Sequence, residues 1–194
     1  MKKVAYLGPP GTYCSLALEE LFVDKEDLIK SYYSSIAEVL DSLEENDLII
    51  VPYENSLDGY VTMVIDYLLE NKCYITNSIT LPVDFSFISN NLLLDTKKVF
   101  VQFKARKQCL KFLKDNNMSF IRTESNVSTL DDFLEQKEVG AIVPSHLITK
   151  EYPLIIKNVA DNFNNFTRFV VITKGLPKLS IGKNLITISI KSKN

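Results

Sequence analysis

Residues 47–71 read DLIIVPYENSLDGYVTMVIDYLLEN, and this stretch shows the pattern on which the whole chain is built. The apolar run at 48–51 is typical of a strand buried in a core. A segment with helical periodicity begins soon after Gly59, and between the two lies a polar tip, Glu54-Asn55-Ser56. Either Asn55 or Ser56 caps the following helix while Glu54 is solvated, or the tip binds a ligand. The letters alone favour neither interpretation.

Strand and helix patterns alternate ahead of this stretch as well. Residues 3–8 read as a strand and residues 14–22 as an amphipathic helix. A further helix is predicted over 34–46, with Ser34 or Ser35 as its cap. This order predicts an α/β fold with a mostly parallel sheet covered by helices.

From Tyr74 the chain becomes extended as far as Ser89, with Pro82 in the middle, and a second strand–helix series follows. A strand of that length in a compact α/β protein often crosses between lobes. Strand patterns in 153–159 and 167–173 are typical of a return to the first lobe. We therefore expect two α/β lobes joined by two crossing strands, with the binding site in the cleft between them.

The predicted first lobe comprises residues 1–76 and 154–180, and the predicted second lobe comprises 77–153. The tail at 181–194 ends in an alternating strand pattern that nothing follows. Because a single strand is a poor ending for a fold, we expect this tail to be the first piece of a further domain.

Composition and charge describe an ordinary globular protein. Of the 194 residues, 46% are hydrophobic and 24% are charged, and the net charge of −2 gives no reason to expect nucleic acid or an acidic membrane as a partner. The basic N-terminus is broken at Gly8-Pro9-Pro10, too early for a signal peptide, and no later stretch is long enough to span a bilayer. The cytoplasm is therefore the expected location.

Cysteine and histidine usage narrows the chemistry. Cys14, Cys73 and Cys109 form no Cys-x-x-Cys pair, which argues against a zinc site and a disulfide framework. The one histidine, His146, is expected as an exposed residue in the first turn of a helix that begins at Ser145. A single histidine excludes a metal site built on several histidines, so a metal would need ligands from Asp and Glu.

Two further polar segments border predicted strands. YLGPPGTYCS at 6–15 is either a plain turn or an anion site, since N–H groups at a helix N-terminus bind carboxylates and phosphates. DNFNNFTRF at 161–169 is either a polar turn before an edge strand or a site where Arg168 pairs with Glu54 or with a ligand carboxylate. With the polar tip, these segments border strands of the first lobe, where open α/β sheets place ligands.

Taken together, YLGPPGTYCS, VPYENSLDG and NNFTRFVVI resemble, in order and separation, the three signature segments of the prephenate dehydratase family. The family's pattern is Gly-Pro-x-Gly-Thr-Phe/Tyr-Ser, then Pro-Ile-Glu-Asn-Ser-x-x-Gly, then Asn-x-Thr-Arg-Phe. The resemblance covers roughly residues 3–174. Three motifs in register are a strong signal, although each alone is weak.

The resemblance implies a reaction, a fold and an assembly. The family converts prephenate to phenylpyruvate, CO2 and water, a carbon–oxygen lyase reaction on the route to phenylalanine. Its catalytic region has two α/β lobes of periplasmic-binding-protein-like architecture with the active site in the interlobe cleft, and it uses no metal and no organic cofactor. A homodimer is expected. The tail at 181–194 resembles the first strand of the family's ACT regulatory domain, so no feedback by phenylalanine is expected for this chain.

The resemblance also assigns roles to residues. Thr167 matches the threonine that hydrogen-bonds the departing hydroxyl, and Glu54 and Asn55 would position that hydroxyl and Thr167. Gly11 and Thr12, with neighbouring N–H groups, would bind the pyruvyl carboxylate. The further substrate-binding residues that it implies are Ser56, Gln108, Asn165, Arg168 and Phe169.

Several positions depart from the family's pattern. Val101-Gln102-Phe103 replace its Ser-His-Pro segment, Cys14 replaces a Ser or Thr, and Asp84 stands where a histidine is often found. Three cations that follow the altered segment either compensate as carboxylate donors or form a solvated helix face. They are Lys104, Arg106 and Lys107.

Two alternative functions remain open. The altered Ser-His-Pro segment favours a paralogue that binds a prephenate-like dicarboxylate without turnover. A non-aromatising prephenate decarboxylase is less favoured, because relatives of that kind lack the Glu-Asn-Ser and Thr-Arg-Phe residues that this chain keeps. The preference between prephenate and arogenate is also left open.

Overall fold

The structure is a computed structural model, and it describes residues 1–23, 27–136 and 138–175. The chain forms two compact units, of which the first comprises Met1–Thr80 and the segment that begins at Arg168, and the second comprises Leu81–Thr167. The two passages between the units fall within strands β5 (Tyr74–Pro82) and β11 (Phe166–Thr173). Each unit has its own sheet, which confirms the predicted two-part α/β class.

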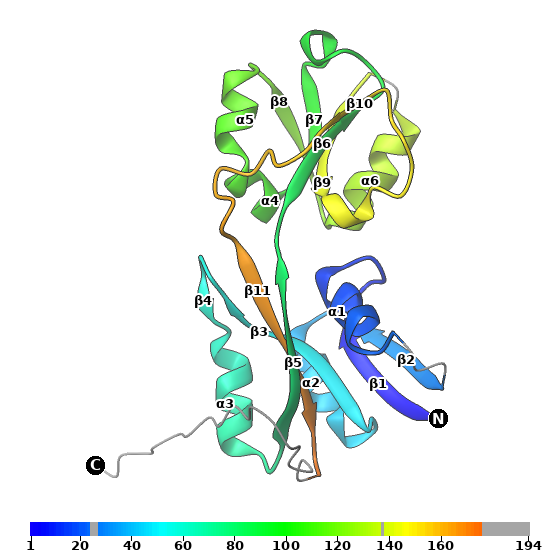
Figure 1. Ribbon diagram of the computed structural model, residues 1–194, viewed down its shortest axis with the longest axis vertical. Helices are drawn as coiled ribbons and strands as arrows, with labels where there is room; N and C mark the ends of the chain where they lie inside the picture. Colours follow the sequence, from blue (N-terminus) through cyan, green and yellow to red (C-terminus); the bar gives the residue numbers. More distant parts are fainter. Residues whose placement is uncertain (24–26, 137, 176–194) are drawn as a thin grey trace, which may run out of the picture. The chain divides into compact units, whose positions relative to one another are not determined.

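The first unit is built on a sheet with the strand order β2-β1-β3-β11-β5, and β4 pairs with β3 (Figure 1). β1 (Lys2–Leu7) is parallel to both of its neighbours, β2 (Leu28–Tyr33) and β3 (Leu48–Asn55). β4 (Gly59–Tyr60) is antiparallel to β3. Because β1 and β3 run in the same direction, their carboxyl ends lie at the same edge of the sheet.

Helices cover this sheet because its strands are apolar on both faces. α2 (Ile36–Asp41) and α3 (Thr62–Glu70) bury Val39 and Val64 against the β1 and β3 side chains of one face. α1 (Tyr13–Leu21) contacts β1 and β3. Ser35 caps α2 with a capping box that also uses Glu38, which settles the cap between Ser34 and Ser35.

The second unit has the strand order β10-β6-β9-β7-β8. β7 is parallel to β8 and β9, whereas β6 is antiparallel to β9 and β10. The strand bounds are β6 (Phe85–Ser89), β7 (Lys98–Gln102), β8 (Ser119–Thr123), β9 (Gly140–Pro144) and β10 (Leu154–Ile156).

Alternating side chains of β7 explain why helices flank both faces of the second sheet. Val99 and Val101 pack with residues of α4 (Phe103–Gln108) and α5 (Leu110–Asp115), whereas Phe100 packs with Phe133 of α6 (Asn126–Glu135). Figure 1 shows α4 and α5 on one side of this sheet and α6 on the other. Among the described residues, short 3-10 helices lie at Ser42–Glu44, Leu93–Asp95 and Ser145–Leu147.

The unit boundaries differ from the predicted lobe boundaries, most of all on the return path. Residues 154–167 were expected in the first lobe, but β10 pairs with β6, with Ile155 opposite Ile88, and this pairing places the segment in the second unit. The short apolar run at 154–156 gave no sign of its sheet, because either sheet could bury it. The first passage falls after Thr80 rather than after residue 76.

Four further expectations concern the tail, membrane spans, metal sites and His146. The tail at 181–194 lies outside the described residues. No helix among the described residues is long and apolar enough to cross a membrane. The same residues contain no group of three or more His, Cys, Asp or Glu side chains that could hold a metal ion. His146 is half-buried in a three-residue 3-10 helix, not exposed at the start of an α-helix, because the chain leaves the helical turn at Ile148.

Candidate functional site

The polar tip ends β3 and forms the turn of a hairpin. Asn55 Oδ1 accepts hydrogen bonds from the N–H groups of Leu57 and Asp58, at 2.9 and 3.0 Å. Gly59 completes the turn with a φ of +80°, a conformation that glycine adopts without strain. Asn55 therefore closes the β3–β4 turn.

The helix that follows does not use the tip as a cap. α3 begins at Thr62, and its N-cap is Val61, which makes no side-chain capping bond. The helix-cap interpretation of Asn55 and Ser56 is therefore wrong. What the sequence could not show is that a two-residue strand, β4, separates the turn from the helix.

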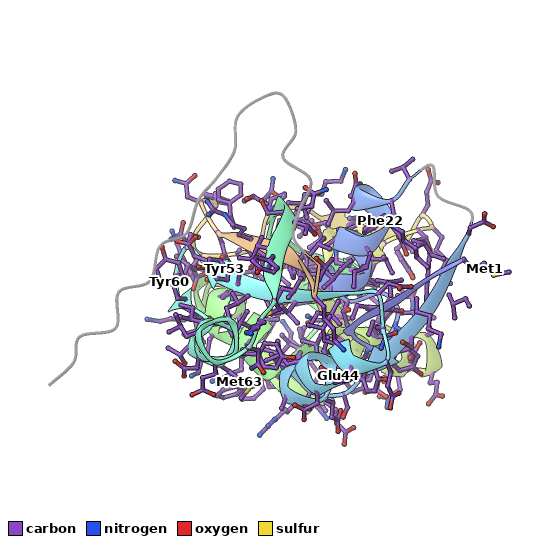
Figure 2. All side chains as sticks on the ribbon, turned by 90° about the horizontal axis from the view of Figure 1, so that it is seen from below. Met1, Phe22, Glu44, Tyr53, Tyr60 and Met63 are labelled. Atoms are coloured by element: carbon purple, nitrogen blue, oxygen red, sulfur yellow. The ribbon has the colours of Figure 1, made fainter. Side chains whose placement is uncertain are left out.

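The hairpin is fixed at its base by aromatic and backbone contacts. The rings of Tyr53 and Tyr60 meet edge to face with centroids 5.6 Å apart, and the Val61 N–H donates to the Tyr53 carbonyl at 2.8 Å. Figure 2 shows the two tyrosines side by side. Because Glu54 is directly opposite Tyr60 in the register, these contacts also fix the backbone of Glu54.

Arg168 and Glu54 form an ion pair across neighbouring strands. Arg168 Nη1 lies 3.6 Å from Glu54 Oε2, and the two side chains are 39% and 32% exposed. Arg168 is in β11 next to β3 in the sheet, so the start of β11 lies beside the end of β3. Of the two partners expected for Arg168, the structure thus shows Glu54. Thr167 precedes Arg168 in the same strand and is half-buried.

The loop after β1 shapes the start of α1. Thr12 is the N-cap of α1, and its hydroxyl donates to the Leu7 carbonyl at 2.9 Å and accepts from the Ser15 N–H at 3.4 Å. The Gly11 N–H donates to Ser15 Oγ at 2.8 Å, and the Thr12 N–H donates to the Pro9 carbonyl at 3.3 Å. Both N–H groups therefore have acceptors inside the loop, which argues against the expectation that they bind the pyruvyl carboxylate directly.

In the second unit the structure brings Gln108 and Asn165 together. Asn165 Nδ2 donates to Gln108 Oε1 at 2.7 Å, and the Asn165 carbonyl accepts from the Val83 N–H at 2.8 Å. Asn165 is 1% exposed, so its side chain supports the chain ahead of β11 and offers little surface to a ligand. Phe169 is 2% exposed and belongs to the core, because β11 is buried on both faces at that point. Neither fits the expectation of a surface that binds substrate.

With this geometry established, sequence comparison identifies the family. The family model described as prephenate dehydratase matches residues 4–176. The chain belongs to the prephenate dehydratase family.

Individual relatives agree with the family model. The chain is 32% identical over 182 residues to a bifunctional chorismate mutase/prephenate dehydratase of Aquifex aeolicus, covering 89% of this chain and 49% of that protein. It is 31% identical over 180 residues to a prephenate dehydratase of Methanocaldococcus jannaschii, covering 89% of this chain and 65% of that protein. The chain thus spans less than two thirds of the length of either relative.

A solved structure supports the fold. The prephenate dehydratase of Staphylococcus aureus superposes with a TM-score of 0.77 at 24% identity, covering 90% of this chain and 67% of that one. The family model likewise includes strands of both units, from β1 at one end to β11 at the other.

The segment that departs from the prephenate dehydratase pattern has local roles. Gln102 is the N-cap of α4, and its Oε1 accepts from the N–H groups of Lys104 and Ala105 at 2.7 and 3.3 Å. Arg106 lies 3.9 Å from the centroid of the Phe120 ring, and Lys107 lies 4.5 Å from that of Phe103. Arg106 and Lys107 thus cover aromatic side chains of the unit's surface, which favours the helix-face interpretation over carboxylate binding.

Cys14, another of the departures from the family's pattern, is not a surface group. It is buried in the first turn of α1, and burial raises the pKa of its thiol to about 12. A thiol with that pKa is protonated at neutral pH and is a poor nucleophile. Cys14 therefore acts as a small apolar core residue.

The sequence does not predict that the Asp161 side chain makes specific hydrogen bonds. Its carboxylate accepts hydrogen bonds from the N–H groups of Leu110 and Lys111, at 3.0 and 3.1 Å. The contact joins segments 51 and 50 residues apart, so no local pattern could reveal it. The only sequence signal is its position four residues ahead of Asn165 in the third motif.

Proposed function

We propose that the chain is a prephenate dehydratase that converts prephenate to phenylpyruvate, CO2 and water. The observation that carries the proposal is the Arg168–Glu54 ion pair directly beside Thr167, in a chain matched by the family model over residues 4–176. These are residues of the second and third motifs: Thr167 directly precedes Arg168 in β11, and Arg168 pairs with the Glu54 carboxylate.

The reaction needs little from the protein beyond binding and charge stabilisation. The bond between the ring and its carboxylate breaks, and the electron pair enters the ring as CO2 departs. The ring–hydroxyl bond breaks as the ring becomes aromatic, and the departing hydroxide takes up a proton from the solvent to form water. Because the product ring is aromatic, the driving force resides in the substrate, and the enzyme lowers the barrier by stabilising the leaving oxygen.

Thr167 is the proposed catalytic residue. Its hydroxyl would donate a hydrogen bond to the departing oxygen as negative charge develops there. The pKa of a threonine hydroxyl is too high for it to give up its proton fully to the leaving group. Its expected contribution is therefore a hydrogen bond that stabilises the developing charge. Glu54 and Asn55 would orient the substrate hydroxyl and Thr167, Glu54 through its pairing with Arg168 and Asn55 by holding the tip in its turn.

The remaining site residues receive revised roles. Gly11 and Thr12 would act by shaping the loop that presents the positive end of α1 to the pyruvyl carboxylate, since their own N–H groups are bonded within the loop. Gln108 and Asn165 would support the segment that carries Thr167. Direct contact between the substrate and Ser56 stays a prediction, as do the lyase class, the cytoplasmic location and the homodimer.

The test is phenylpyruvate formation from purified prephenate by the wild type, Thr167→Ala and Thr167→Ser. Loss of a hydrogen bond to the leaving group is expected to slow Thr167→Ala by about a hundredfold or more, and Thr167→Ser should retain most of the activity. Wild-type binding of prephenate without turnover would make the non-catalytic paralogue the better interpretation. Release of CO2 without phenylpyruvate would point to the decarboxylase.

A further inference from the structure

The segment that leads into Thr167 has no regular structure of its own. Residues 157–165 lie between the end of β10 and the start of β11, and Thr167 is the second residue of β11. The position of the Thr167 hydroxyl therefore depends on what fixes this segment as well as on the pairing of β11 in its sheet. The sequence places Asp161 and Asn165 in this segment, and their hydrogen bonds to Gln108, to Val83 and to the start of α5 lie within the second unit.

Gln108 holds the segment at two points. Its carbonyl accepts from the Asp161 N–H at 2.6 Å, and its side-chain Oε1 accepts from Asn165 Nδ2 at 2.7 Å. Both ends of the stretch from Asp161 to Asn165 are thus hydrogen-bonded to the same residue, Gln108. It ends directly before β11 begins, and the bond from the Val83 N–H to the Asn165 carbonyl adds a further attachment there.

The Asp161 carboxylate ties the same stretch to α5. Its Oδ2 accepts from the Leu110 N–H and its Oδ1 from the Lys111 N–H, the first two residues of that helix. The N-cap residue of α5, Cys109, makes no side-chain capping bond. A helix start has N–H groups without intrahelical partners and a favourable field for an anion, so a carboxylate there is well bound. Asp161 supplies the cap that the helix lacks in its own sequence.

We propose that Asp161 is a positioning residue for the dehydration, one that holds the Asp161–Asn165 stretch against Gln108 and so places Thr167 against the departing hydroxyl. The inference rests on the proposed function and goes beyond it by naming a residue that does not touch the substrate. A displacement of about 1 Å in a reacting group slows a reaction by about a hundredfold. Small movements of this stretch are therefore expected to change turnover before they change folding.

The experiment compares Asp161→Asn with the wild-type chain. The substitution keeps the shape of the side chain but removes its charge and one of its two acceptors. The expected result is a decrease in kcat of about tenfold to a hundredfold with KM unchanged, because Asp161 affects the placement of Thr167 and not the binding of prephenate. Asp161→Ser, which keeps one acceptor, is the second variant if Asp161→Asn does not fold, and its kcat should also fall.

Glu38→Gln is the matched control. Glu38 also accepts backbone N–H groups near a helix start, from Ser34 at 3.0 Å and Ser35 at 3.1 Å, but it does so at α2 in the first unit. Loss of this cap is expected to leave kcat at the wild-type value. An equal decrease in both variants would mean that kcat follows overall stability, which would overturn the positioning role.

A second readout separates this inference from the proposed function. Hydrogen–deuterium exchange without substrate should become faster at residues 108–111 and 161–167 in Asp161→Asn, and stay unchanged there in Glu38→Gln. Unchanged exchange in Asp161→Asn would mean that Asp161 does not hold the Asp161–Asn165 stretch. Faster exchange with wild-type kcat would mean that holding this stretch has no role in turnover. If the wild type forms no phenylpyruvate, the proposed function fails, while the exchange data still decide whether Asp161 holds the segment.

Discussion

Arg168 on β11 places its guanidinium Nη1 3.6 Å from the Glu54 carboxylate at the end of β3. Thr167 is the residue before Arg168, so the pair ties the strand that carries the proposed catalytic hydroxyl to the polar tip of the hairpin. Both side chains are about a third exposed, and partly exposed ion pairs contribute at most about 1 kcal/mol to stability. The pair therefore matters more for geometry than for the free energy of unfolding.

Arg168→Lys should reduce turnover far more than stability. Lysine keeps the positive charge but lacks the planar, forked guanidinium that fixes the carboxylate. We expect the free energy of unfolding to change by less than about 1 kcal/mol, while phenylpyruvate formation slows by about tenfold or more. Urea unfolding and steady-state kinetics on the same preparation would measure both.

Another ion pair of the first unit is the control for that experiment. Lys174 Nζ lies 2.6 Å from Glu44 Oε2, with both side chains more exposed than those of the first pair. Lys174→Met should leave stability and turnover close to wild type, because nothing assigns this pair to the site. Equal losses in Arg168→Lys and Lys174→Met would contradict a specific role for Arg168.

Gly59→Ala should strain the backbone of the turn that follows the polar tip. The space around Gly59 is open, so an added methyl group meets no atom within 4 Å, but its φ of +80° is unfavourable for alanine. We expect a loss of about 1 kcal/mol in the free energy of unfolding and a lower kcat, because the turn that positions Glu54 is strained. Gly175→Ala is the control, since Gly175 also has open space and no positive φ. Its stability should equal or slightly exceed that of the wild type.

Glu38 should give α2 a pH-dependent cap. The hydrogen bond from the Ser34 hydroxyl, followed by the N–H groups of Ser34 and Ser35, lowers the pKa of the Glu38 carboxyl below its ordinary 4.5, although partial desolvation opposes the shift. A carboxyl with a lowered pKa in the folded state stabilises that state above 4.5 and loses this effect as the pH falls through the lowered value.

The wild type should therefore resist urea better than Glu38→Gln at neutral pH, and the two midpoints should converge as the pH falls well below 4.5. A difference that stays constant across this range would mean that the carboxylate charge contributes nothing to the cap. An NMR titration of Glu38 in the folded protein would measure the lowered pKa directly.

Much of the fold could be predicted, because long apolar runs and helical periodicity identify elements directly. The strand at 48–51 is confirmed, and so is a helix capped by Ser35, one of the two caps expected, although this helix ends at Asp41 and not at residue 46. The sheet membership of 154–156 was not, since three apolar residues can add to either sheet and only the pairing with β6 decides between them.

The site was less predictable, because roles depend on partners far apart in the chain. From the sequence, Arg168 could pair with Glu54 or with a ligand carboxylate. The structure shows Glu54 as its partner, because β3 and β11 are neighbours in the sheet. The N–H groups of Gly11 and Thr12 were expected to bind a carboxylate, but Ser15 Oγ and the Pro9 carbonyl accept their hydrogen bonds, and only the fold of the loop shows this. The Asp161 contact with α5 joins positions 51 residues apart, which no motif encodes.

Cysteine reactivity tests how readily the part of the second unit around Cys109 opens to solvent. Burial raises the pKa of Cys109 to about 12, and the nearby Asp161 carboxylate adds to the shift. At neutral pH about one such thiol in a hundred thousand is ionised, and a buried thiol is also out of reach of reagents. Cys14 is buried with a pKa of about 12 as well, whereas Cys73 is only half-buried, although burial raises its pKa too.

In the native protein a thiol reagent such as Ellman's reagent should therefore label Cys73 alone, and all three cysteines only after unfolding. Cys73→Ser should remove the native signal and leave the other two sites to appear in denaturant. Because Cys109 directly precedes α5 and Asp161 caps that helix, Asp161→Asn combined with Cys73→Ser should make Cys109 react faster without denaturant. If Cys109 in that double variant reacts no faster than in Cys73→Ser, the cap does not control the opening of this part of the unit.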